Sequence, residues 1–157
     1  MEPSRFDEVA FFRRLAQSGA RALLIGRRAL VLLGLPVLTA DYDFWIAIDD
    51  IDTFNAVAGQ FDLSPSLTPD DARRRGRYVL ENDEHIDVLV ARSVPDVTGT
   101  AIAFDDLWLR RRAIRVADVD VAIPAIDDLI ATKQFAARPK DLEDISLLRL
   151  LKDEGRT

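Results

Sequence analysis

The chain of 157 residues has no cysteine and a single histidine, His85. The absence of cysteine excludes disulfides, iron–sulfur clusters, cysteine-ligated zinc and thiol nucleophiles, and a lone histidine excludes sites built from several imidazoles. The longest apolar run, residues 29–38, is interrupted by a glycine and a proline and is too short to span a bilayer. The charged N-terminal residues do not resemble a secretory signal. These absences predict a soluble, cytoplasmic protein with no membrane partner.

Lysine is also scarce, with three residues against 18 arginines, and the net charge is −6. An acidic chain does not adhere broadly to nucleic acid or to anionic membranes. Arginines gather in residues 73–77 and 110–115. The planar guanidinium suits phosphate, although short basic runs more often form a solvated face.

Hydrophobic residues make up 48% of the chain and charged residues 31%, a composition typical of globular proteins. No linker or repeat divides the sequence, so we expect one domain over residues 1–157. Its core would cover about residues 21–123, followed by a C-terminal helical segment over about 124–152.

Hydrophobic periodicity and turn residues predict alternating helices and strands. Helices are expected at 3–17, 28–33, 51–61, 104–111, 126–136 and 141–152. Strands are expected at 21–25, 41–48, 77–80, 85–91, 113–117 and 119–123, with residues 64–71 as a turn-rich connection. The strands at 77–80 and 85–91 would form a hairpin, and those at 113–117 and 119–123 would form another hairpin or a bent strand pair. This order predicts an α+β fold with a mixed β-sheet flanked by helices and C-terminal helices packed on it.

Three carboxylates on two of these strands carry the strongest chemical signal. Residues at i and i+2 of a strand project to the same side, so Asp41 and Asp43 share a face while Tyr42 and Phe44 anchor the strand in the core. If the strand at 85–91 is a neighbour, Asp87 joins them. Crowded carboxylates repel one another, and hard cations such as Mg²⁺ resolve that conflict. The pattern predicts a metal site, with a pair of ordinary edge-strand aspartates as the alternative.

Aspartate pairs with the same spacing occur elsewhere by chance, since 21 of the 27 acidic residues are Asp. The pair at 118 and 120 reads as a hairpin turn, and the pair at 50 and 52 reads as a helix start. Only Asp41 and Asp43 alternate with residues that demand burial.

Further motifs surround these carboxylates. A strand ends at Gly26, a short helix follows, and Thr39 precedes the Asp-x-Asp pair. This order, together with Asp87, is similar to the nucleotidyltransferase superfamily with the DNA polymerase beta fold. The C-terminal stretch from Ile126 to Ile145 resembles the AbiEii-type branch, known from bacterial toxin–antitoxin systems. The resemblance covers about residues 21–151.

The resemblance implies transfer of a nucleoside monophosphate from a nucleoside triphosphate to a hydroxyl of RNA or protein. Two Mg²⁺ ions would be held by Asp41, Asp43 and Asp87, and Asp87 would help to draw off the acceptor proton. Nucleotide binding would involve the residues Gly26, Arg27, Thr39 and Lys133. An antitoxin protein is the implied partner.

The sequence departs from the family pattern at two positions. Arg27 follows Gly26 where the family carries glycine or serine, and Val37 stands where the family has arginine. A small residue lets backbone N–H groups approach phosphate, which Arg27 would obstruct or replace with its own charge. The alternative is therefore a catalytically degenerate protein that binds a nucleotide or a partner. A third possibility is a structural adaptor that docks through the helix at 141–152.

Several other residues have both a structural explanation and a functional one. His85 shares the predicted face of Asp87 and could touch a nucleotide or an acceptor there, but a hydrogen bond to its own turn is the favoured explanation. Trp45 and Trp108 suit core packing, with base stacking as the alternative. Lys140 and Asp144 would help to hold the last helices near the site, or would form an i,i+4 surface ion pair.

Overall fold

The computed structural model describes residues 6–96, 98–136 and 138–154. The helices are α1 Glu8–Ser18, α2 Gly26–Leu32, α3 Ile51–Gly59, α4 Pro69–Arg75, α5 Phe104–Leu109, α6 Ile126–Ala136 and α7 Pro139–Asp153, with a 3₁₀ turn at Ile48–Asp50. The strands are β1 Ala22–Ile25, β2 Tyr42–Ile46, β3 Ser64–Pro65, β4 Arg77–Glu81, β5 His85–Leu89, β6 Ser93–Pro95, β7 Ala101–Ala103, β8 Arg112–Val116 and β9 Val119–Ile123.

The central sheet has five strands in the order β1-β2-β5-β4-β3, and β6–β7 and β8–β9 form two separate hairpins. β2 and β5 run parallel, whereas every other pair in the central sheet is antiparallel. The sheet is therefore mixed, as the sequence predicts.

Both faces of the interior strand β2 are covered. On one face Phe44 and its neighbours pack against the aromatic residues of α1 and α3. On the other face Trp45 is fully buried against Phe104 and Leu107 of α5. Trp45 is therefore a core residue, which confirms the prediction that it serves core packing rather than base stacking.

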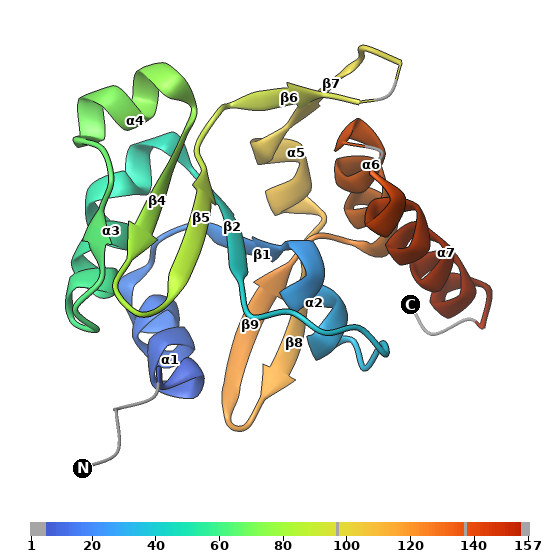
Figure 1. The fold of residues 1–157 in the computed structure, drawn as a ribbon, viewed down its shortest axis with the longest axis horizontal. Helices are drawn as coiled ribbons and strands as arrows, with labels where there is room; N and C mark the ends of the chain where they lie inside the picture. The colour runs from blue at the N-terminus through green and yellow to red at the C-terminus, as the bar shows by residue number, and fades with distance from the viewer. Residues whose placement is uncertain (1–5, 97, 137, 155–157) are drawn as a thin grey trace.

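Helices α6 and α7 pack together at the opposite end of the molecule from α3 and α4 (Figure 1). α7 also contacts α2, the short helix that follows β1. Two segments far apart in the chain thus meet beside the N-terminal half of β2. Among the described residues, no helix has the length and apolar character needed to cross a membrane.

The predicted elements agree with the structure except in two places, apart from residues 3–5 of the first predicted helix, which lie outside the described residues. The turn-rich segment 64–71 contains the two-residue strand β3 and the start of α4. The start of α4 carries a Thr68 side-chain cap and Pro69, and the helix ends at Gly76, which has φ +79°. These are helix start and stop signals that the prolines and short polar residues of the segment obscured. The β6–β7 hairpin was also unpredicted, because its strands have only three residues each.

Candidate active site

The parallel pairing of β2 with β5 brings Asp43 and Asp87 side by side. The two residues are direct partners in the strand register. Adjacent strands lie about 4.8 Å apart, so both side chains leave the same face of the sheet as close neighbours. The sequence-based expectation that Asp87 lies beside the Asp-x-Asp strand therefore agrees with the register.

Asp43 is in an environment that disfavours its charge. Its pKa is raised from 3.8 to about 6, first by burial, then by the neighbouring carboxylates of Asp87 and Asp41, with a further contribution from a hydrogen bond to Asp87. Lys133 acts in the opposite direction. A half-buried carboxyl group beside a second carboxylate is stabilised either by a shared proton or by a bound cation.

Gly26 is required by this arrangement. It has φ +69°, and a Cβ added there would fall against the Asp43 carboxylate. The residue belongs to the turn from β1 into α2, so the turn passes directly over Asp43. The structure thus places the predicted nucleotide turn and the predicted metal ligand in contact.

Asp41 lies just before β2 and is exposed. Its backbone N–H donates to Oγ1 of Thr39 at 3.1 Å, and the Thr39 carbonyl accepts from Arg28 at 3.1 Å. Arg28 also lies over the Tyr42 ring, 4.3 Å from its centroid. Arg28, which the sequence did not single out, therefore holds the loop that leads to Asp41.

Arg27 and Lys133 both bind Asp144, whose side chain is fully buried. Lys133 Nζ lies 3.0 Å from Asp144 Oδ2, and Arg27 Nε lies 3.2 Å from the same oxygen. Arg27 Nη2 is 3.1 Å from Oδ1, close enough for an ion pair but not aligned as a hydrogen bond. Arg27 thus reaches toward α7, and its fork is occupied by a carboxylate of the chain itself.

The predicted surface ion pair between Lys140 and Asp144 does not form in the structure. Asp144 is 0% exposed and bound by Arg27 and Lys133, while Lys140 is exposed and has no ion-pair partner within the described part of the chain. The buried positions of α7 are 141, 144, 145 and 148, whereas Leu142 is 56% exposed. The helical spacing of these positions indicates that residue 144 faces the core, but an aspartate there is not counted when only apolar residues are used to find the buried face.

His85 lies beside Asp87, with Nε2 3.2 Å from Oδ1. Its partner is therefore a candidate site carboxylate rather than the backbone of its own turn. The side chains of His85 and Asp87 are each 42% exposed, so this edge of the site is open to solvent.

Among the described residues, no group of three or more His, Asp or Glu side chains lies close enough together to hold a metal ion. The paired Asp43 and Asp87 nevertheless fit a divalent cation by their chemistry, because both are hard oxygen donors and one of them is destabilised as an anion. Asp41, at the exposed start of the strand, is the third predicted ligand.

The fold is shared with nucleotidyltransferases of known structure. A candidate nucleotidyltransferase from Thermotoga maritima is 16% identical with a TM-score of 0.57, covering 92% of this chain and 89% of that one. The lincosamide antibiotic adenylyltransferase LnuA, bound to lincomycin, is 12% identical with a TM-score of 0.63, covering 93% and 98%. The antibiotic-resistance factor ANT(2'')-Ia is 12% identical with a TM-score of 0.65, covering 89% and 79%. No protein-family model and no curated protein matches the sequence.

Magnesium should stabilise the folded protein through the Asp43–Asp87 pair. At a concentration about 100 times its dissociation constant, Mg²⁺ is expected to add about 2–3 kcal/mol to the free energy of unfolding. Thermal unfolding followed by circular dichroism, with Na⁺ at matched ionic strength, measures this gain. Asp43→Asn should remove most of it, whereas Asp49→Asn, an exposed change just beyond the other end of β2, should not. An equal gain in both variants would place the cation elsewhere.

Proposed function

We propose that the protein is a nucleotidyltransferase that moves a nucleoside monophosphate from a nucleoside triphosphate to a hydroxyl group. The observation that carries this proposal is the pairing of Asp43 with Asp87 across parallel strands, directly beneath the Gly26 turn. The shared fold of the adenylyltransferases supports it. The residues proposed for the site are Asp41, Asp43 and Asp87 for metal, and Gly26, Arg27, Thr39 and Lys133 for nucleotide.

In this reaction the acceptor oxygen bonds to the α-phosphorus, and the bond from that phosphorus to the bridging oxygen breaks, releasing pyrophosphate. Bound divalent cations would neutralise the developing charge on the phosphate oxygens. Asp43 and Asp87 would hold them, with Asp41 at the solvent side. Asp87 would also accept the acceptor proton, and His85, 3.2 Å away, would pass it to solvent.

In this proposal, Lys133 provides a fixed positive charge that attracts and orients the triphosphate. Its side chain is 7% exposed, and it acts electrostatically on Asp43 while bound to Asp144. A fixed cation beside the metal carboxylates would attract triphosphate. Asp144 would hold Lys133 in place from α7.

We infer that the acceptor is a hydroxyl of RNA or protein, and that the protein is a toxin-like transferase of the AbiEii type controlled by an antitoxin partner. The C-terminal sequence resemblance supports this assignment. Structures of two neighbours contain lincomycin and adenylyl-2''-tobramycin, which makes a small hydroxylated molecule a further acceptor class to test.

Transfer should be detected by incubating the protein with Mg²⁺, cell extract and each nucleoside triphosphate labelled at the α-phosphate. We expect label in one acceptor fraction (RNA, protein or small molecules) with one nucleotide preferred. A label at the γ-phosphate should not transfer, which separates this reaction from phosphorylation. Asp43→Asn and Asp87→Asn should abolish the signal, and Asp49→Asn should retain it. Failure of all four α-labelled nucleotides would refute the enzymatic proposal.

The second candidate is a catalytically degenerate nucleotide-binding or partner-binding module, and the contacts of Arg27 favour it. Arg27 binds Asp144 and also lies 3.4 Å from the Leu38 carbonyl, so it braces the turn rather than leaving it open. Calorimetry with Mg²⁺ and triphosphate distinguishes the two candidates. Metal-dependent binding without pyrophosphate release would select the binding module.

A further inference from the structure

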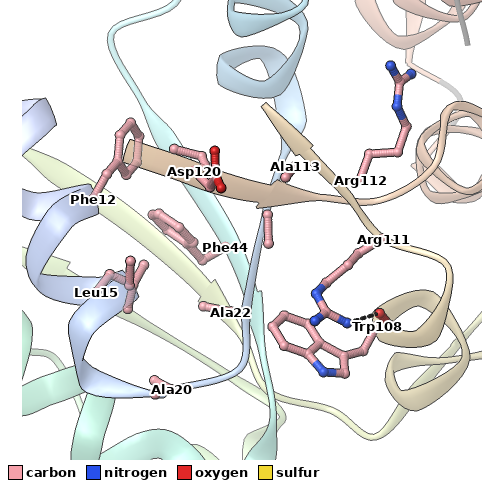
Figure 2. A pocket seen from close by; sticks show the side chains of 14 residues that line it. Phe12, Leu15, Ala20, Ala22, Phe44, Trp108, Arg111, Arg112, Ala113 and Asp120 are labelled. Atoms are coloured by element: carbon pink, nitrogen blue, oxygen red, sulfur yellow. Dashed lines mark hydrogen bonds between the residues drawn. The ribbon is translucent and has the colours of Figure 1, made fainter. Parts of the chain in front are cut away.

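A cavity of about 610 Å³ lies between α1 and the β8–β9 hairpin, beyond the edge strand β1. Figure 2 shows Phe12 and Leu15 on the α1 side and Trp108 with Arg111 on the opposite side. The Arg13–Asp118 ion pair joins α1 to the turn of the hairpin. The cavity has the size of small-molecule sites, about 300–1,000 Å³.

Small side chains keep this cavity open. Ala20, Ala22 and Ala113 lie along it between the two walls (Figure 2), and Gly19 has free space where a side chain would project. Larger residues at these positions would fill the space, as packed protein interiors normally do. The result is a slot with an apolar wall on one side and an indole on the other.

The Trp108 wall is held rigidly. Phe104 stacks on the indole with ring centroids 6.1 Å apart and an interplanar angle of 16°. The Arg111 guanidinium lies 3.9 Å from the Trp108 ring centroid, and its Nη1 donates to the Trp108 carbonyl at 2.8 Å. The wall therefore presents the Arg111 guanidinium together with the indole, and a preformed surface of this kind binds a flat ring at little cost in side-chain entropy.

The charge in the cavity is positive at one end. Arg111 and Arg112 both line the cavity, and the buried Nη1 of Arg112 has no hydrogen-bond partner among the described residues. Asp120, the acidic residue of the lining, is paired with Arg115. Arg111 has no carboxylate partner among the residues that the structure describes, although the chain as a whole carries a net charge of −6. Its Nε and Nη2 groups remain available as donors, and a guanidinium fork suits a carboxylate.

We propose that this cavity is a second ligand site that takes a small planar aromatic carboxylate. The ring lies in the slot between α1 and Trp108, and the carboxylate is bound by Arg111. The site is separate from the Asp43–Asp87 carboxylates, and its occupancy does not depend on nucleotidyl transfer.

Titration with 2-naphthoate, followed in ¹H–¹⁵N spectra of the whole protein, tests the proposal. We expect shifts of the Trp108 indole signal and of the Ala20 and Ala22 amides. The Trp45 indole, buried and bonded to the Ala91 carbonyl at 2.8 Å, should stay in place and serve as an internal control. No shift at about 5 mM ligand would overturn the proposal, since a specific site binds more tightly than this.

Variants distinguish specific binding in the cavity from non-specific hydrophobic binding. Arg111→Gln should weaken naphthoate about tenfold by removing the charged hydrogen-bond donor, and Ala113→Phe should block it by filling the slot. Arg75→Gln, which makes the same charge change at an exposed position away from the cavity, should have no effect. Neutral 2-naphthalenemethanol should bind about tenfold more weakly than naphthoate to the unaltered protein.

Three results would contradict the assignment. Equal binding of naphthoate and the neutral alcohol would show that the charge of Arg111 plays no part. Retention of binding in Ala113→Phe would place the ligand outside the slot. Shifts of the same signals with protein concentration alone would show that a second copy of the chain occupies the cavity.

Discussion

Replacing Asp43 with asparagine should abolish nucleotidyl transfer and, at the same time, stabilise the folded protein near pH 7.5. Loss of a metal-ligating carboxylate is expected to reduce the rate by about a hundredfold to a thousandfold. The gain in stability follows because the substitution removes a half-buried charge that Asp87 and Asp41 repel. We expect about 1–2 kcal/mol, less than a fully buried group would give, because solvent screens part of the repulsion.

The stability effect has a defined pH dependence. The pKa of Asp43 is raised from 3.8 to about 6 on folding, so the folded state retains a proton that the unfolded state releases. Stability contributed by this group is therefore complete below about pH 4 and declines as the pH rises to about 6. Asp43→Asn should flatten this part of the profile. Urea unfolding from pH 3.5 to 8 measures it, with Asp49→Asn as the control that keeps the decline.

A stabilised variant with full activity would contradict the assignment of Asp43 as a metal ligand. A destabilised variant would contradict the repulsion between Asp43 and Asp87. The two readouts are independent, so each part of the interpretation can fail separately.

Replacing Asp144 with asparagine should destabilise the protein by about 3–5 kcal/mol, because the change leaves Lys133 and Arg27 without their buried counter-charge. Denaturant unfolding at pH 7 measures the loss. Glu143→Gln neutralises the adjacent, exposed carboxylate of α7 and is expected to change stability by less than about 0.5 kcal/mol.

The double variant Lys133→Met/Asp144→Leu tests the cause of that loss. Replacing both charges by apolar side chains should recover part of the stability, because a buried ion pair contributes little beyond mutual compensation. In this double variant Arg27 loses its carboxylate partner, but it is 24% exposed and its charge can still be solvated, so it reduces the recovery of stability only in part. Equal destabilisation in Asp144→Asn and Glu143→Gln would show that the buried cluster has no energetic role.

Most of the fold could be predicted because its signals are local. Alternation of apolar and acidic residues identified β2 and placed Asp43 on a defined face, and the two sequence hairpins appear as β4–β5 and β8–β9. The β2–β5 register required an assumption of adjacency that periodicity cannot supply. It came from the family resemblance, and the structure agrees with it.

The partners of charged side chains could not be predicted in the same way. Arg27 and Asp144 are 117 positions apart, and no local pattern indicates that they meet. The cavity beside Trp108 was also unpredictable, because it depends on the distance between α1 and a hairpin about 100 residues later. Long-range packing decides both features.

The buried Asp144 makes the order of synthesis matter. The helix that carries it is made last among the described elements, whereas Arg27 is made early and Lys133 shortly before α7. In a nascent chain that lacks α7, Arg27 and Lys133 have no carboxylate between them, so we expect the β1–α2 turn to be held less firmly until α7 docks. Folding intermediates that lack α7 should therefore keep Lys133 exposed to water, where its charge is solvated rather than paired.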